Sequence, residues 1–308
     1  NKEFDFATWG RTGSVAASGG SSWVTNTVEK TAKVDINKSA ITVDKDLHVD
    51  AITLDNIIAK AKLATGSVVV SAAKVEVKKN DITINDEINV KNSNLKNKSN
   101  KGEITLTAAD DSNIYAGAFG HVGTLVGSYV DASLDHNMTR KNTINITRDK
   151  ASADYDIYSN SNVKLYAGDF ADGRIGGLFS RIEAQGYEAG IIPVGQITYA
   201  IDEDYNNVLN SKLTMDNQVI IGANTKVASI GDTNIYADDG AVDHKTISLK
   251  QSWYPDDGAK TSSYSTVQNT DNNANVDLKS KISVLGSVLA GQDGEVVLAI
   301  GKQGELVI

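Results

Sequence analysis

The sequence predicts an all-β protein, a right-handed parallel β-helix (β-solenoid), and the main observation is a ladder of very short strand words between residues 34 and 106. In each word apolar and polar residues alternate, which places successive side chains on opposite faces of a strand. Strands this short cannot each support a sheet, but stacked on similar strands they bury a continuous core. The words are Ile41-Thr-Val43, Ile52-Thr-Leu54, Val68-Val-Val70, Val75-Glu-Val77, Ile82-Thr-Ile84, Ile88-Asn-Val90 and Ile104-Thr-Leu106.

Composition is the second observation. Aromatic residues make up 6% of the 308 residues and Pro occurs twice, so small and β-branched residues must build a narrow interior. The absence of Cys excludes disulfides, a thiol nucleophile and a Cys-based zinc site. The sequence starts with Asn1 and shows no signal peptide, and it ends on the apolar strand Glu305-Leu-Val-Ile308. Because solenoid ends normally carry caps, we expect a single continuous solenoid segment over 1–308 that belongs to a longer chain.

Charge is unevenly distributed. The formal net charge is −9, with 15 Lys and Arg against 12 Asp and Glu in residues 1–102, and 15 against 27 in residues 103–308. Nucleic acid is not an expected partner, because phosphate contacts need a basic stripe. The acidity is typical of a solvated, secreted surface.

Residues 1–106 are predicted to form short regular coils. The run Ser18-Gly-Gly-Ser-Ser22 is interpreted as a loop between strands, and residues 91–102 as a polar loop. Residues 82–104 correspond to about one coil of three short strands. Residues 55–64 contain good helix formers, but the Ala-Lys-Ala-Lys alternation favours a strand.

Residues 107–308 are predicted to form coils with long excursions, because a longer repeat takes over. Its words are Asn113-Ile-Tyr-Ala116, Lys164-Leu-Tyr-Ala167 and Asn234-Ile-Tyr-Ala237, each followed by a Gly-, Ala- and Asp-rich excursion and an Asn-rich return. Unequal spacing indicates a constant coil with insertions of variable length. The excursion over residues 176–201 alternates well enough to form long strands, with Pro193 at an edge, bulge or strand start.

Repeat positions are interpreted as structural. We expect Tyr115, Tyr166 and Tyr236 to form one stack, because equivalent positions of stacked coils face each other. The Asn-rich returns are predicted to form hydrogen-bonded ladders at the corners. These returns begin at Asn142, Asn206 and Asn272.

Candidate chemistry is sparse, and we predict no catalytic, cofactor-binding or metal-binding residues. The four histidines lack metalloprotease spacing and are expected on the surface or in loops: His48, His121, His136 and His244. Three acidic clusters are interpreted as solvated turns, with calcium binding as the alternative: Asp202-Glu-Asp204, Asp238-Asp-Gly240 and Asp256-Asp-Gly258. The nonapeptide calcium pattern is absent.

Aromatic residues in the third excursion are the best candidates for binding. Trp253-Tyr254-Pro255, with Tyr264 nearby, would stack on a sugar or fill a pocket of a partner. The alternative is that these side chains pack the excursion onto the flank of the solenoid.

The repeat texture resembles a known family. The Asn-Ile-Tyr-Ala words, the excursion Gly186-Tyr-Glu-Ala-Gly-Ile-Ile-Pro-Val194 and the return Tyr205-Asn-Asn-Val208 resemble the large repetitive exoproteins of Gram-negative bacteria, which include filamentous-haemagglutinin-like and leukotoxin-like adhesins. The similarity covers roughly residues 30–290 and rests on texture, not on an active-site motif. It implies a right-handed parallel β-helix, two-partner or autotransporter (type V) secretion, and adhesion, virulence or biofilm roles.

From this resemblance we expect a non-enzymatic segment of a secreted, cell-surface filamentous adhesin. Its expected partners are a host glycan or protein, other bacterial surface components and neighbouring coils of the parent chain. No membrane insertion is expected in this segment. The alternatives are a carbohydrate-active β-helix enzyme, which needs paired carboxylates in a groove, and a purely structural fibre or S-layer component.

Overall fold

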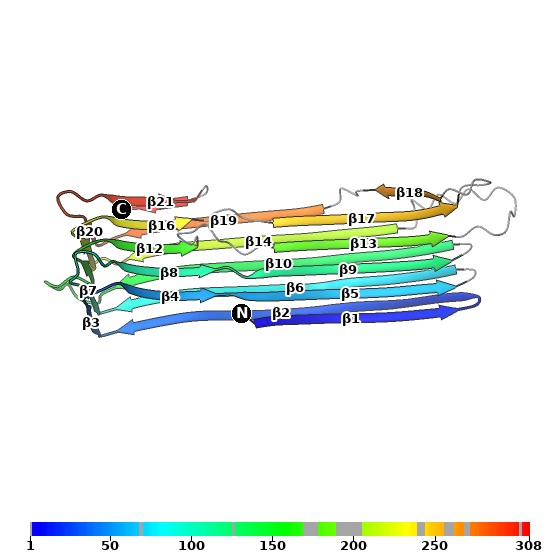
Figure 1. The fold of residues 1–308 in the computed structure, drawn as a ribbon, viewed down its shortest axis with the longest axis horizontal. Coiled ribbons are helices and arrows are strands. Elements are labelled where there is room, and N and C mark those ends of the chain that lie inside the picture. The colour runs from blue at the N-terminus through cyan, green and yellow to red at the C-terminus, as the bar shows by residue number, and fades with distance from the viewer. Residues whose placement is uncertain are drawn as a thin grey trace.

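The computed structural model describes residues 2–67, 70–124, 127–168, 178–188, 205–238, 244–255, 262–267, 272–301 and 304–308. In these ranges the chain is all β and winds into stacked coils (Figure 1). Four sheets, A to D, run through the stack, and almost all of their strand pairs are parallel. The exception is the antiparallel pair β17–β18 in sheet A. The prediction of an all-β protein with parallel sheets is therefore confirmed.

Each of the first four coils contributes one strand to each sheet, so the first coil is β1, β2, β3 and β4, whereas the fifth coil adds both β17 and β18 to sheet A. Sheet A contains β1 (Lys2–Ser14), β5 (Asp55–Ser67), β9 (Asn113–Thr124), β13 (Leu178–Glu188), β17 (His244–Pro255) and β18 (Ser262–Val267). Sheet B contains β2 (Ala17–Asn37), β6 (Val70–Lys91), β10 (Gly127–Thr147), β14 (Tyr205–Ile221), β19 (Asn272–Val284) and β22 (Gly304–Val307).

Sheets C and D are built from shorter strands. Sheet C contains β3 (Ala40–Val43), β7 (Asn94–Asn97), β11 (Ile157–Ser159), β15 (Lys226–Ser229) and β20 (Ser287–Leu289). Sheet D contains β4 (Leu47–Thr53), β8 (Ile104–Asp110), β12 (Val163–Gly168), β16 (Thr233–Asp238) and β21 (Val296–Ile300).

The path of one coil explains the elongated shape. The long strands of sheet B run along the molecule, sheet C crosses at one end, and sheet D leads back into sheet A (Figure 1). One part of the molecule is therefore enclosed by sheets B, C and D, and the other part is a sandwich of sheet A on sheet B. No helix in the described ranges has the length and apolarity needed to cross a bilayer.

Among the described residues, the core consists of three apolar clusters separated by two buried polar columns. One cluster fills the space between sheets B, C and D, and the other two lie between sheets A and B. The first column stacks Asn26, Asn80, His136 and Ser211 on neighbouring strands of sheet B. The second stacks Asp86, Asn142 and Asn217 in the same way.

Asn side chains in these columns form hydrogen bonds from one coil to the next. Asn26 Nδ2 donates to Asn80 Oδ1 at 2.9 Å, and Asn142 Nδ2 donates to Asn217 Oδ1 at 2.8 Å. In-register stacking thus gives buried amides a partner in the next coil. The predicted Asn ladders do occur, but the described ones lie within long strands and not at corners.

The predicted coil length is wrong. Residues 82–90 lie in one continuous strand, β6, so residues 82–104 do not form a coil of three short strands. One coil separates Asn26 from its partner Asn80, 54 residues later. The long sandwich strands are also present from the first coil on, since β2 has 21 residues, so the short regular coils expected for residues 1–106 do not occur.

Local predictions had mixed outcomes. Residues 55–64 lie in β5, which confirms the preference for a strand. Ser18–Ser22 lies inside β2, so the predicted loop is wrong, and residues 91–102 include the strand β7. The small residues of β2 leave room for a neighbouring side chain. The Leu63 side chain lies 3.5 Å from the position that a Cβ of Gly20 would occupy. Of the excursion predicted for residues 176–201, the described residues include β13, and Pro193 lies outside them.

Gly168, the last residue of β12, has a φ of +100°, which disfavours residues with a side chain. A Cβ there would collide with the backbone oxygen of Asp238 and lie 2.6 Å from the Asn217 side chain. We expect Gly168→Ala to lower the free energy of unfolding by about 2 kcal/mol, because it adds backbone strain to a clash. Chemical denaturation measures this loss.

Gly123 in β9 provides the matched control. No heavy atom lies within 4 Å of its Cβ position, and its φ is outside the left-handed region. Gly123→Ala should therefore change stability by less than about 1 kcal/mol. Equal losses in the two variants would contradict the assignment of strain to Gly168.

Candidate functional site

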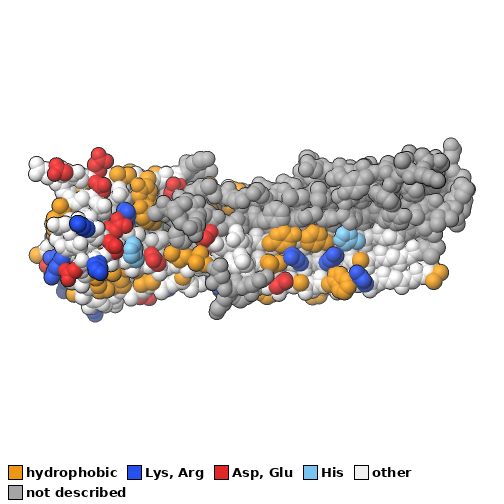
Figure 2. Space-filling view, viewed as in Figure 1, with side chains coloured by type: hydrophobic (Ala, Val, Ile, Leu, Met, Phe, Trp, Pro, Cys, Tyr) orange, Lys and Arg blue, Asp and Glu red, His pale blue; other side chains and the backbone are white. Residues whose placement is uncertain are grey.

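The outer face of sheet A carries an unusual group of outward-facing side chains on β1, β5 and β9. We call it the aromatic–cationic face and define it as Trp9, Arg11, Lys60, Lys62, Tyr115, Phe119 and His121. Figure 2 shows hydrophobic, basic and His side chains gathered over this part of the molecule. The parallel register brings residues from three coils together, because Trp9 pairs with Lys62 and Lys62 with Phe119.

Strand alternation explains why these side chains share one side. Neighbours such as Ala59, Ala61 and Leu63 point into the sandwich and are buried, so Lys60 and Lys62 point outward. Trp9 is 61% exposed, a large exposure for the side chain with the most apolar surface to bury. Trp9 therefore contributes to this face by leaving apolar surface exposed in the first coil.

Cations lie over the aromatic rings of this face. The Arg11 guanidinium carbon is 4.7 Å from the centre of the Trp9 ring, and Lys60 Nζ is 5.2 Å from that of Tyr115. Such contacts are attractive because the ring face carries partial negative charge. They orient the rings while leaving cationic N–H groups available to an anion.

Gly117 shapes the floor of the face between two aromatic residues of β9. A Cβ at this position would lie 2.5 Å from the Phe119 ring and 2.9 Å from Tyr115 Oη. Both side chains therefore lean over the backbone of Gly117. The absence of a side chain at Gly117 therefore lets the two aromatic side chains cover this buried position.

The local charge is opposite to that of the whole chain. Among the described side chains of β1 and β5, the carboxylates are the exposed Asp5 and the half-buried Asp55, which lies 3.4 Å from Lys30 Nζ. Strand β9 contains no carboxylate. A positive patch thus lies on a protein whose net charge is −9.

Histidines are distributed differently from the prediction. His48 is exposed as expected, and His121 belongs to the aromatic–cationic face. His136 is fully buried in the polar column with Asn80 and Ser211, so the surface prediction is wrong for this residue. The side chain of His244 lies outside the described residues.

The predicted tyrosine stack is confirmed for one pair. Tyr166 and Tyr236 are register partners in sheet D, and their rings stack with centroids 5.1 Å apart. Burial raises the pKa of the Tyr166 hydroxyl. Tyr115 lies in sheet A next to Ile58, so its inclusion in this stack was wrong. The three words share a pattern but occupy two different sheets.

The aromatic residues predicted from the third excursion lie at the end of sheet A. Trp253 pairs with Tyr187 on one side and with Tyr264 on the other, through the backbone of β13, β17 and β18. Their side chains lie outside the described residues, as do the acidic clusters apart from Asp238. Within the described ranges, no group of three or more His, Asp or Glu side chains could hold a metal ion.

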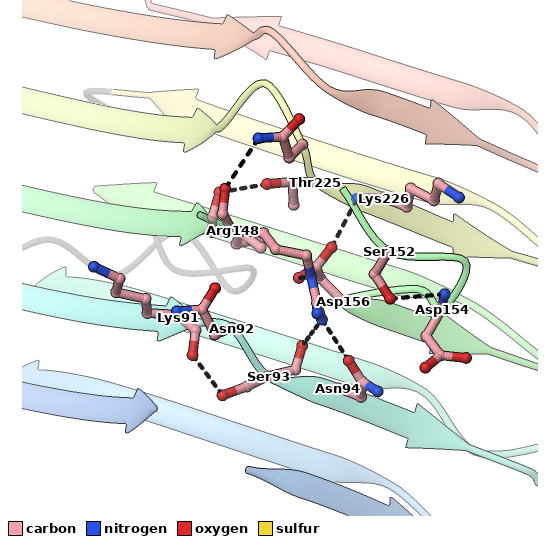
Figure 3. A network of polar contacts seen from close by, with 12 residues as sticks. Lys91, Asn92, Ser93, Asn94, Arg148, Ser152, Asp154, Asp156, Thr225 and Lys226 are labelled. Carbon is pink, nitrogen blue, oxygen red and sulfur yellow. Dashed lines mark hydrogen bonds and ion pairs between the residues drawn. The ribbon is translucent and has the colours of Figure 1, made fainter. Parts of the chain in front are cut away.

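Two charged networks were not predicted from the sequence, and each of them joins residues of different coils. At the corner between sheets B and C, Arg148 Nε lies 2.7 Å from Asp156 Oδ1, and an Arg148 terminal nitrogen donates to the Ser93 backbone oxygen at 3.0 Å (Figure 3). Asp156 Oδ2 accepts from the Lys226 backbone N–H at 2.9 Å. This network connects three coils and occupies both oxygens of the buried Asp156 carboxylate.

The second network lies inside the sandwich, next to the Asp86 column. Arg140 Nε is 2.8 Å from Asp110 Oδ2, and both side chains are buried. Neither of these two atoms forms a hydrogen bond, so the contact is an ion pair. Thr53 Oγ1 donates to Asp86 Oδ1 at 2.6 Å. Burial raises the pKa of Asp86 to about 8 and raises that of Asp110 as well, against the lowering effect of Arg140.

The sequence contained part of the signal for the aromatic–cationic face. Trp9-Gly-Arg11 and Lys60-Ala-Lys62 alternate with small residues, which predicts one shared side for each pair. The register between coils brings the two pairs together, and the unequal coil lengths hide this register in the sequence.

Comparison of the chain with protein-family models, curated proteins and solved structures found no match.

Proposed function

We propose that this chain is a segment of a secreted, surface-exposed filamentous adhesin of a Gram-negative bacterium. It acts as a non-enzymatic stalk and displays a binding surface for a host glycan or protein. The observation that carries the proposal is the aromatic–cationic face, an outward-facing group on a stack of parallel coils. The repeat texture, similar to filamentous adhesins, supports the same function.

The architecture suits a stalk. Each coil adds about 4.8 Å along the stacking direction, so a chain of such coils lengthens without needing a new core. We infer a right-handed winding, the hand that parallel strand connections favour. The first coil leaves the outer edges of β1 and β2 free of a described strand, where a neighbouring coil of a parent chain would pair.

A carbohydrate-active enzyme is the less favoured alternative. Such enzymes use two carboxyl groups that face a substrate groove. The two carboxyl groups with the most perturbed surroundings, Asp86 and Asp110, are 0% and 2% exposed inside the sandwich. Their raised pKa values follow from burial in the core, so they do not indicate acid–base catalysis.

An array of glycans and extracellular-matrix proteins tests the proposal with the chain as it exists. We expect saturable binding to at least one component, with no release of reducing ends from polysaccharides. Turnover of a polysaccharide would favour the enzyme. Absence of saturable binding to all components, together with filaments in electron micrographs, would favour a purely structural fibre.

A further inference from the structure

We propose that the aromatic–cationic face of sheet A binds an acidic polysaccharide whose negative charges are widely spaced carboxylates. The inference rests on the proposed function and names the ligand class for it. The glycan lies across β1, β5 and β9, perpendicular to the strands. Trp9, Tyr115 and Phe119 contact sugar rings, and Arg11, Lys60 and Lys62 bind the carboxylates.

The arrangement of the rings indicates a sugar ligand. Trp9, Lys62 and Phe119 occupy one column of the sheet, on three neighbouring strands. With strands about 4.8 Å apart, Trp9 and Phe119 are separated by about 10 Å, a length that two sugar rings span. Aromatic rings pack against the C–H groups of a pyranose ring, and this column offers the exposed ring of Trp9 and the half-buried ring of Phe119.

The cations of the face are available to a ligand. Among the described residues, no carboxylate is an ion-pair partner of Arg11, Lys60 or Lys62, whereas the lysines of sheet B, such as Lys33 and Lys79, are paired with Glu87 and Asp81. The contacts of Arg11 and Lys60 on the described face are to aromatic rings. A carboxylate would bind at this position without displacing a protein anion.

Charge density decides between classes of polyanion. Nucleic acids and highly sulfated glycans gain affinity from many closely spaced contacts to cations. This face offers three cations on a chain of net charge −9, whose overall field repels a dense polyanion. A polysaccharide with one carboxylate for every one or two sugars matches three separated cations and gains the rest of its affinity from the rings.

Hyaluronan and polygalacturonate are the probes, with dextran as the neutral comparison. Heparin and a dT20 oligonucleotide represent dense polyanions. Binding is measured by calorimetry for the full chain, for R11Q/K60Q/K62Q and for W9A. The matched control is K45Q/K98Q/K101Q, which removes the same charge from exposed lysines at other positions. Far-ultraviolet circular dichroism and the unfolding midpoint verify the fold of each variant.

We expect saturable binding of at least one carboxylated probe and none of dextran. The charge variant should bind at least tenfold more weakly and W9A at least fivefold, whereas the control stays within twofold. Equal weakening in the control, tighter binding of heparin or dT20 than of the carboxylated probes, or no carboxylated binding would overturn the inference. If the array ligand still binds the charge variant with unchanged affinity, the adhesin proposal stands and this ligand assignment fails.

Discussion

Asp86→Asn is expected to raise the free energy of unfolding by about 4 kcal/mol at pH 7, because it removes a carboxyl group whose ionised form is excluded from the core. Asp86 is fully buried between two apolar clusters of the sandwich. Burial is the main cause of its pKa of about 8, and the neighbouring Asp110 carboxylate adds to the shift. Asn has nearly the same shape and no charge to exclude.

The shifted pKa of Asp86 determines how the free energy of unfolding changes with pH. The pKa of Asp86 is about 8 in the folded chain, and in the unfolded chain it returns to the ordinary value of 3.8. Between these values the folded chain holds a proton that the unfolded chain has released, so raising the pH favours unfolding. The contribution of Asp86 to the free energy of unfolding is largest below about pH 4. It falls by up to about 1.4 kcal/mol per pH unit until about pH 8.

The polar column also explains why Asn fits at this position. Asp86 Oδ2 and Asn142 Oδ1 are buried without hydrogen-bond partners, and the two residues are neighbours in sheet B. The amide nitrogen introduced at position 86 would donate to Asn142 Oδ1 and extend the ladder that Asn142 forms with Asn217. The amide oxygen introduced with it would keep the hydrogen bond from Thr53.

Urea denaturation between pH 5 and pH 9 measures the effect. The difference between Asp86→Asn and the unchanged chain should grow with pH and level off above about pH 8. Asp50→Asn, a substitution of an exposed carboxylate in β4, serves as the control and should leave the slope unchanged. A variant that is no more stable than the unchanged chain at pH 8 would show that the Asp86 carboxyl carries no penalty.

The period-two pattern predicted strands well, and the repeated words predicted parallel stacking. Ile82, Ile84, Ile88 and Val90 are all buried in β6, as their alternation requires. The Tyr166–Tyr236 pair shows that a repeated word does identify register when both copies occupy the same sheet. Tyr115 shows the weakness of this inference, because the same word also fits the outer face of sheet A.

Coil length could not be predicted, because polar residues have two meanings in this fold. Asn80-Asp81 and Asn85-Asp86 have the composition of turns, yet all four residues lie inside β6. Asn80 and Asp86 point inward to buried columns, and Asp81 and Asn85 point to solvent. A turn would use the same residue types. Only stacked partners in neighbouring coils make a polar residue stable inside a strand, and a single sequence does not show which residues stack.

The aromatic–cationic face illustrates the same restriction for function. Its members come from three coils that are separated by about 55 residues each, so no local motif contains them. In contrast, the binding residues predicted from the sequence, Trp253-Tyr254-Pro255, are adjacent in one stretch. Surface sites on solenoids form across coils, and their prediction requires the register first.

Arg140→Met is expected to destabilise the chain by about 3–5 kcal/mol at pH 7, because it leaves the Asp110 carboxyl buried without its cation. Arg140 lies in a column with Ile84 and Met215, so Met suits the space and the loss is not one of packing. The ion pair with Asp110 and the hydrogen bond to the Ser112 backbone oxygen at 3.0 Å are both removed. The cost should shrink as the pH falls toward the ordinary carboxyl pKa of 3.8, because the unfolded chain then binds the same proton as the folded variant.

The double variant Asp110→Asn/Arg140→Met separates the charge from the packing. The amide oxygen introduced at position 110 keeps the hydrogen bond that Asp110 Oδ1 accepts from the Ser112 backbone N–H at 2.8 Å, and no ion remains at this place in the core. Because burying two charges costs about as much as their attraction returns, we expect the double variant to recover most of the stability, to within about 1 kcal/mol of the unchanged chain. Urea denaturation at pH 5 and pH 8 compares the three proteins. If the double variant were as unstable as Arg140→Met, the guanidinium would stabilise the sandwich by its shape and its contact with Ser112, and the paired charge would contribute little.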